Sequence, residues 1–164
     1  MRVRPATADD GGFLAAMLRE AAHWRPDPPA PPLEVILADP AVAHYVDGWP
    51  RSDDGGVVAV DDDDTPIGAA WWRRFAADEP AFGFVDDRTP EIAIGVVAAW
   101  RGQGVGTALL HALHDAARQA GLAGLSLSVA RENPAKRLYE RMGYVVVGGS
   151  DGNPTMVVEL GSPS

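Results

Sequence analysis

The sequence predicts one α/β domain, a mixed sheet with helices on both of its faces. Two observations lead to this prediction. The chain has 164 residues, 46% of them hydrophobic, which suits one domain with a substantial core and leaves too little chain for a second. Strand-like segments come first, and strand, helix, strand, helix and strand then alternate, as in a sheet covered by helices. We therefore expect residues 1–164 to form a single domain.

The N-terminal part predicts a strand followed by a helix. Arg2–Arg4 is a short strand, and Thr7–Asp10 has the residues of a capping box that ends in aspartate. Apolar residues then recur at helical spacing, and they are Phe13, Leu14, Met17, Leu18, Ala21 and Ala22. The helix should end before Arg25, because the proline-rich stretch 26–32 fits neither a regular helix nor a strand. We expect a connecting loop there and a short helix over 33–38.

The middle of the chain predicts two paired strands and a long loop. Val57–Val60 and Ile67–Trp72 are apolar strands, and four consecutive carboxylates, Asp61–Asp64, connect them. Neighbouring side chains on an extended chain point to opposite faces, so a solvated turn is favoured over a metal site. The polar stretch 73–90 is expected to be a loop. The histidines also lack metal-ligand spacing, so we expect no metal; they are His23, His44, His111 and His114.

The second half has the clearest periodicity, with helical segments between strands. The expected strands are Glu91–Val97, Leu125–Val129, Tyr144–Val147 and Thr155–Leu160, the last two paired antiparallel. An amphipathic helix is expected over 104–120, and Gly121 ends it. Asn133 and Pro134 are typical of the N-cap and first position of a second helix, which Gly143 closes.

The charge balance and the absence of cysteine narrow the class of function. The 23 acidic and 14 basic side chains give a formal net charge of −9, which repels nucleic acid and anionic lipid, so we expect neither as a partner. No apolar run approaches the roughly 18–20 residues of a membrane helix, and no signal-peptide core follows Met1. The lack of cysteine excludes disulfides and cysteine nucleophiles. We expect a cytoplasmic protein.

The segment Arg101–Gly106 follows a strand and begins a helix, an arrangement that binds anions. Glycines let a phosphate approach the backbone closely, and the free N–H groups of the first helical turn point at it. A Walker P-loop would end in Gly-Lys-Ser/Thr, whereas Thr107 and Ala108 follow here. A dinucleotide fingerprint would need glycine at position 107 and an acidic ribose partner near the end of the next strand. An Arg-x-x-Gly-x-Gly loop remains.

This loop resembles motif A of the GNAT superfamily of N-acetyltransferases, which carries Gln/Arg-x-x-Gly-x-Gly/Ala between its fourth strand and third helix. The resemblance extends upstream to Ile94-Gly95-Val96 and downstream to Asn133–Tyr144, which is similar to the family segment Asn-x-x-Ala-x-x-Leu-Tyr-x-x-x-Gly-Phe/Tyr. These motifs cover about residues 91–147. Ala98 departs from the proline that many members have, which changes the stiffness of the loop. The resemblance implies a GNAT-like fold with a mostly antiparallel sheet.

The resemblance implies that acetyl-CoA is the co-substrate. In the family, backbone groups near Ile94, Gly95 and Val96 pair with the pantetheine arm as an added strand would. The pyrophosphate is held by the loop and the first helical turn, and the residues implied are Arg101, Gly102, Gln103, Gly104, Val105, Gly106 and Thr107. Asn133 either contacts the cofactor or only caps its helix, and both interpretations stay open.

The resemblance also implies the catalytic roles. Tyr139 matches the tyrosine that often protonates the departing CoA thiolate, and packing in the apolar face of its helix is the alternative. The amine must be neutral before it attacks, so a general base is expected, directly or through water. Glu91 is the first candidate, with a solvated strand end as its alternative, and Asp86 and Asp87 are weaker candidates. An amide near Val96 would meet the oxyanion.

Three tryptophans are candidates for the acceptor pocket. Trp24 precedes the proline-rich loop, and Trp71 and Trp72 are adjacent in a strand. Because side chains alternate along a strand, Trp71 and Trp72 cannot both point inward. An exposed tryptophan in a strand would indicate a ligand surface.

The hypothesis is therefore an enzyme, an N-acetyltransferase that transfers an acetyl group from acetyl-CoA directly to a primary amine of a small molecule or peptide. An acetyl-cysteine route is excluded because the chain has no cysteine. The alternatives are a non-catalytic acyl-CoA-binding or regulatory module, and a nucleotide-phosphate enzyme, which the missing P-loop lysine disfavours. Polyamines, aminoglycosides, amino acids and protein N-termini all stay open as acceptors. Family members often dimerise, so a homodimer is also possible.

Overall fold

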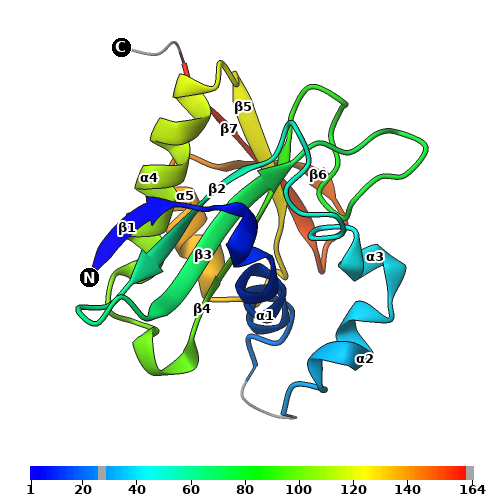
Figure 1. The fold of residues 1–164 in the computed structure, drawn as a ribbon. Helices are drawn as coiled ribbons and strands as arrows, with labels where there is room; N and C mark the ends of the chain where they lie inside the picture. The colour runs from blue at the N-terminus through cyan, green and yellow to red at the C-terminus, as the bar shows by residue number, and fades with distance from the viewer. Residues whose placement is uncertain (26–28, 162–164) are drawn as a thin grey trace.

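A single seven-stranded sheet organises the computed structural model, which describes residues 1–25 and 29–161 (Figure 1). In sheet order its strands are β1 (Arg2–Pro5), β2 (Gly55–Val60), β3 (Pro66–Arg73), β4 (Glu91–Val96), β5 (Gly124–Ser128), β7 (Pro154–Glu159) and β6 (Val145–Gly149). All neighbours pair antiparallel except β4 and β5, which are parallel. The predicted mixed, mostly antiparallel sheet is confirmed.

Helices cover both faces of this sheet, as predicted. They are α1 (Gly11–Ala22), α2 (Leu33–Leu37), α3 (Pro40–Ala43), α4 (Val105–Gln119) and α5 (Ala135–Arg141), with 3-10 turns at Ala8–Asp10 and Ala98–Trp100. The capping box is present, since the Thr7 side chain accepts from the N–H of Asp9 and the Asp10 carboxylate accepts from the N–H of Thr7. Two elements were not predicted, α3 and the 3-10 turn at Ala98–Trp100.

Two apolar cores form, one on each face of the sheet, and the adjacent Trp71 and Trp72 each belong to one of them. Trp71 packs with Leu14 and Met17 of α1, while Trp72 packs on the other face with Leu109 and Leu113 of α4. The two indoles do point to opposite faces, but both are buried, 1% and 5% exposed. The expectation that one of them lines an acceptor pocket is therefore wrong, because helices cover both faces of β3.

The parallel strands β4 and β5 are paired at a single residue pair and then diverge. This pair is Glu91 opposite Ser126, and the N–H of Ser126 donates to the carbonyl oxygen of Pro90 at 2.9 Å. Beyond that pair the strands diverge, so the β4 edge on the β5 side lacks a partner strand over its remaining length. On the face toward α1, helix and strand touch at Gly95, where a β-carbon would collide with the carbonyl oxygen of Met17.

A buried ion pair fixes the connection between α3 and β2. Arg73 binds Asp54 through two hydrogen bonds, at 3.0 and 2.6 Å, and both side chains are 1% exposed. The same guanidinium donates to the carbonyl oxygens of His44 and Asp47. Trp71 adds an indole hydrogen bond to the carbonyl oxygen of Tyr45 at 3.0 Å. The backbone at Tyr45 is therefore held firmly against the sheet.

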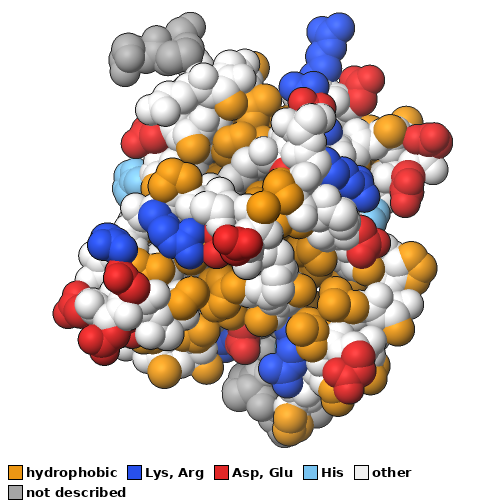
Figure 2. Space-filling model, in the orientation of Figure 1, with side chains coloured by type: hydrophobic (Ala, Val, Ile, Leu, Met, Phe, Trp, Pro, Cys, Tyr) orange, Lys and Arg blue, Asp and Glu red, His pale blue; other side chains and the backbone are white. Residues whose placement is uncertain are grey.

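The remaining elements lie within a few residues of their predicted ranges. Asp61–Asp64 form the turn between β2 and β3. The predicted loop 73–90 begins one residue later than expected, because Arg73 still belongs to β3, and it is otherwise loop apart from one isolated bridge. The predicted loop residues 26–28 lie outside the described residues. Acidic side chains stand in separate groups around one face, with apolar side chains between them (Figure 2). Among the described helices none is long and apolar enough to cross a membrane, and the described residues hold no cluster of potential metal ligands.

Candidate active site

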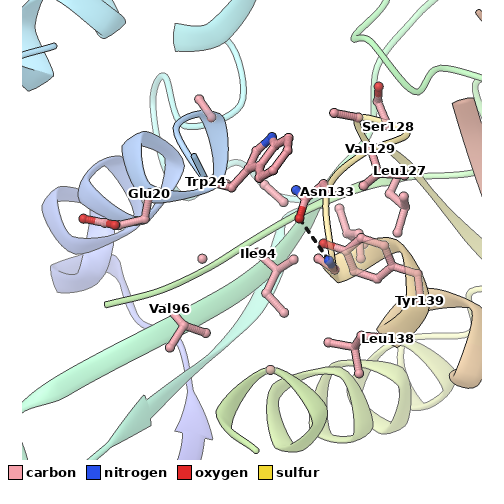
Figure 3. A pocket seen from close by; sticks show the side chains of 18 of the residues that line it. Glu20, Trp24, Ile94, Val96, Leu127, Ser128, Val129, Asn133, Leu138 and Tyr139 are labelled. Carbon is pink, nitrogen blue, oxygen red and sulfur yellow. Dashed lines mark hydrogen bonds between the residues drawn. The ribbon is translucent and has the colours of Figure 1, made fainter. Parts of the chain in front are cut away.

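A cavity of about 1080 Å³ occupies the gap between β4 and β5. Its walls come from β4, from β5 and the following Val129 and Ala130, from the C-terminal half of α1, and from the starts of α4 and α5 (Figure 3). This volume slightly exceeds the usual range of ligand pockets, about 300–1,000 Å³. The divergence of two parallel strands therefore creates the site.

The start of α4 lies at one end of the cavity, and we call this end the anion site because its geometry suits an anion. Gly104, with φ of 84°, precedes the helix, and the first helical hydrogen bond runs from Ala108 to Gly104 at 3.1 Å. The N–H groups of Val105, Gly106 and Thr107 thus lack helical partners and point out of the helix end. A β-carbon at Gly102 or Gly104 would meet nothing within 4 Å, so the space above the loop is open. Such a helix end suits a phosphate.

Six of the seven residues predicted for this end of the cavity line it. Gln103 is the exception, since its side chain turns back and donates to the carbonyl oxygen of Ala99 at 3.0 Å. Arg101 reaches across to α1, where it pairs with Glu20 at 2.7 Å, and it makes a long 3.4 Å hydrogen bond to the carbonyl oxygen of Val96. The glycine loop is thereby tied to α1.

The free edge of β4 presents alternate backbone groups to the cavity. Val97 donates to the carbonyl oxygen of Ile67 in β3 at 2.9 Å, whereas the carbonyl oxygen of Pro90 accepts from β5. Backbone groups alternate along an antiparallel pair, so odd-numbered residues face β3 and even-numbered ones face β5. Ile94 and Val96 therefore offer their N–H and C=O groups to the gap. The N–H and C=O groups of Gly95 point to β3 instead, and its lack of a side chain leaves room for the backbone of α1 at Met17.

Glu91 lies where β4 and β5 are still paired and is only 2% exposed. One carboxylate oxygen accepts from the hydroxyl of Tyr45, and the other accepts from the N–H of Gly83 at 2.8 Å. Burial raises the pKa of Glu91 to about 7, although both hydrogen bonds act in the opposite direction. The alternative of a solvated strand end is wrong. A cavity-lining carboxylate that is half ionised near neutral pH is suited to accept a proton.

Tyr139 comes from α5 on the opposite wall and is buried at the cavity surface. Burial raises its pKa above the ordinary value, so the phenol keeps its proton throughout the working range of pH. Its ring also packs edge-on against Tyr144, with centroids 5.9 Å apart. Its packing is therefore confirmed, and its position at the cavity surface is compatible with the other interpretation, protonation of the departing thiolate, which stays a prediction.

Asn133 makes the predicted capping contact and also lies on the cavity wall, while its contact with the cofactor stays a prediction. Its side-chain oxygen accepts from the N–H of Ala135 at 2.9 Å, which caps α5, and the residue lines the cavity (Figure 3). Trp24, at the end of α1, points into the same space toward Asn133 (Figure 3). Of the three candidate tryptophans, Trp24 alone lines the cavity.

The sequence analysis missed three aromatic residues of the site, Tyr45, Phe82 and Trp100, the last in the 3-10 turn before the glycine loop. Tyr45 follows α3, and Phe82 belongs to the loop after β3, and both line the cavity near Glu91. The weaker candidates Asp86 and Asp87 are exposed and do not line it; Asp86 instead accepts from the N–H groups of its own loop. No local pattern marks Tyr45 or Phe82, because Tyr45 contacts Glu91 and Phe82 across 46 and 37 residues of sequence.

Comparisons with known proteins agree with this geometry. The model of the acetyltransferase (GNAT) family matches residues 18–144. A ribosomal-protein-alanine N-acetyltransferase from Brucella melitensis is 21% identical, with a TM-score of 0.69 over 97% of this chain and 99% of that one. The comparison with curated proteins gives no match.

Two further solved structures contain the expected co-substrate or its product. PaiA N-acetyltransferase from Thermoplasma acidophilum, in complex with coenzyme A, is 17% identical, with a TM-score of 0.67 over 97% of this chain and 99% of that one. A phosphinothricin acetyltransferase from Sinorhizobium meliloti, in complex with AcCoA, is 22% identical, with a TM-score of 0.64 over 98% and 88%. At these identities the likeness shows the fold.

Proposed function

Since the chain belongs to the acetyltransferase (GNAT) family, we propose that it transfers an acetyl group from acetyl-CoA to a primary amine by direct transfer. One observation supports this most strongly. A single cavity joins the anion site at the start of α4 to a buried carboxylate with a pKa of about 7, Glu91. The first feature suits a pyrophosphate, and the second suits the deprotonation of an amine.

The residues around the cavity fit coenzyme A. The open N–H groups of Val105, Gly106 and Thr107 would hold the pyrophosphate, and the free β4 edge at Ile94 and Val96 would pair with the amide groups of the pantetheine arm. Fold neighbours crystallised with coenzyme A or AcCoA support the same assignment. When bound, acetyl-CoA supplies the activated acetyl group as a thioester.

Glu91 is the proposed general base. An amine attacks only in its neutral form, and Glu91 accepts the proton that the amine loses, directly or through a water. Tyr45 and Gly83 occupy one acceptor site on each carboxylate oxygen, and each oxygen retains a second. With a pKa of about 7, Glu91 is ionised and able to accept this proton above neutral pH.

The other two groups act on the thioester side. One N–H group at this edge of β4, that of Ile94 or of Val96, is proposed to stabilise negative charge on the thioester carbonyl oxygen, and the remaining backbone groups there pair with the pantetheine arm. Tyr139 is proposed to donate its hydroxyl hydrogen to the departing sulfur. Its raised pKa makes it a reluctant acid, so the hydrogen bond it donates is expected to matter more than complete proton transfer.

An amine panel tests this proposal. Purified protein is mixed with acetyl-CoA and individual primary amines, and free thiol is measured together with the mass of the amine product. We expect amine-dependent thiol release and a product that has gained one acetyl group, above the background without amine. Binding of coenzyme A by calorimetry, with no amine-dependent thiol release, would instead identify a non-catalytic acyl-CoA-binding module. Tighter binding of ATP than of acetyl-CoA would favour a nucleotide enzyme.

A further inference from the structure

Away from the glycine loop, the cavity has polar side chains on the side of β5, α5 and the β6–β7 turn, Ser128, Asn133, Ser150 and Asn153, and an almost entirely apolar wall on the side of α1, α3 and the loop after β3. We call this apolar side the acceptor end, and its lining residues are Leu18, Ala21, Trp24, Val42, Tyr45 and Phe82, together with Glu91. They come from α1 and the segment just after it, from α3 and the residues after it, and from the loop after β3. Three of the six wall residues are aromatic, and Glu91 carries the one carboxylate.

Phe82 is an unusual member of this wall. Its side chain is 62% exposed, although its ring stacks on Tyr45 with centroids 6.5 Å apart and planes 18° apart. Its backbone is also pinned, because the N–H of Phe82 donates to the Tyr45 hydroxyl at 3.2 Å and the next N–H, of Gly83, donates to Glu91. An exposed aromatic ring held in one place beside a buried carboxylate is a surface that a ligand would cover.

The charges around the cavity disfavour two kinds of acceptor. Among the described residues that line it, the arginines are Arg101, which is paired with Glu20, and Arg141, which belongs to α5 on the opposite wall. The acceptor end thus offers no cation to bind an acceptor's carboxylate, and burying a carboxylate without a partner is costly. Glu20 is already paired, so a second ammonium of a polyamine would also lack a free carboxylate there.

We infer that the acceptor is a small primary amine attached to a flat apolar group, an arylalkylamine, with no carboxylate and no second cationic centre. Its ring would lie against Phe82 and Tyr45, and its amino group would point to Glu91. This inference rests on the proposed function, and it adds the chemical class of the acceptor.

A matched series of amines tests the class. We choose 2-phenylethylamine, phenylalanine, which adds a carboxylate to the same skeleton, spermidine, and a peptide amide with N-terminal phenylalanine. We expect kcat/KM for 2-phenylethylamine to exceed that for each of the others by at least about tenfold, the size of effect that one unmatched polar group produces. Equal or faster turnover of phenylalanine, spermidine or the peptide would overturn the inference.

A variant at the exposed ring tests the position of the aryl group. Phe82→Ala removes a mostly exposed side chain, and we expect it to raise the KM for 2-phenylethylamine about tenfold while leaving acetyl-CoA affinity unchanged. Val85→Ala is the control, because Val85 belongs to the same loop, is also exposed, and does not line the cavity. An unchanged KM in Phe82→Ala, or an equal effect in Val85→Ala, would remove Phe82 from the acceptor site.

Binding separates a failure of this inference from a failure of the proposed function. If no amine releases thiol, calorimetry of the coenzyme A complex with the same four amines replaces kinetics. Selective binding of 2-phenylethylamine that Phe82→Ala weakens would support the acceptor class while refuting transfer. The absence of such binding would overturn the acceptor class as well.

Discussion

The hydroxyl of Tyr45 gives the sharpest test of Glu91 as the base. Tyr45→Phe keeps the ring that packs against Phe75 and Phe82 but removes the donor to the Glu91 carboxylate. This hydrogen bond lowers the pKa of Glu91 against the effect of burial. Without it, the neutral carboxyl is favoured further, and the pKa of Glu91 rises from about 7.

The size of the change follows from the type of hydrogen bond. Hydrogen bonds to charged groups contribute about 1.5–3 kcal/mol, and 1.36 kcal/mol corresponds to one pH unit, so the pKa should rise by about one to two units. At pH 7 the ionised fraction would fall from about one half to between about 1% and 9%. Activity at pH 7 should therefore drop about 5- to 50-fold and largely return above about pH 9.

The assay is the pH dependence of kcat/KM with one amine, compared between Tyr45→Phe and the unmodified chain. The titration of the amine itself is common to both profiles, so the displacement of the acid limb reports on the enzyme. Tyr144→Phe is the control, since its hydroxyl binds His114 at 2.9 Å in the other core and lies apart from Glu91. An unmoved acid limb, or an activity loss that is equal at every pH, would refute the reasoning. An NMR titration of the Glu91 carboxyl measures the same pKa without turnover.

Three further predictions concern stability and the acid. The native pKa of Glu91 is raised from 4.5 to about 7, so stability is fully present below pH 4.5 and declines as pH rises through 7. The Glu91→Gln variant lacks this decline. The difference between its free energy of unfolding and that of the unmodified chain should therefore increase by about 3 kcal/mol between pH 4.5 and pH 8. Urea titrations at several pH values measure this difference. A constant difference would contradict the burial of an ionisable group. Tyr139→Phe should lower kcat at least about tenfold with acetyl-CoA affinity unchanged by calorimetry, and unaltered kcat would remove Tyr139 as the donor. Gly95→Ala should destabilise the fold by about 1–3 kcal/mol in thermal denaturation, because the new methyl group meets the carbonyl oxygen of Met17, whereas Gly12→Ala, with open space around it, should not destabilise.

The sequence could predict those parts of the site whose structure is determined locally. The glycine loop Arg101–Gly106 and the helix after it depend on backbone conformations that neighbouring residues fix, so their pattern is visible in the chain. The hairpin turn Asp61–Asp64 and the strands around it are local in the same sense. A signal for α3 was also present, since Asp39 accepts from the N–H of Ala41 and Pro40 occupies the first helical position.

Other parts depend on contacts between distant residues. Tyr45 reaches Glu91 only because Arg73 and Trp71 hold its backbone against the sheet, and none of these pairings leaves a periodic pattern. Trp72 shows a different limit. Alternation along β3 placed the two indoles on opposite faces correctly, but their burial required combining that result with the prediction of helices on both faces.

The strand β4 separates the two substrates in the proposed reaction by using different groups for each. Toward the β5 side it presents the backbone of Ile94 and Val96, which would serve acetyl-CoA whatever their side chains are. Toward α1 it presents the side chain of Glu91, whose carboxylate accepts hydrogen bonds from the Tyr45 hydroxyl and from the N–H of Gly83. Glu91 and Ile94 are three residue steps apart along the extended chain, about 10 Å.

This division explains why the glycine-loop motif predicts the acetyl donor but gives no information about the acceptor amine. The donor contacts come from backbone groups and a helix end within residues 94–107, where spacing and glycines leave a pattern in the sequence. The acceptor wall comes from residues 18–45 and from Phe82, on elements whose only shared feature is that they pack near Glu91. Substitutions at Phe82 should therefore change the choice of amine while coenzyme A binding stays constant. Joint loss of both would mean that the two ends of the cavity are not independent.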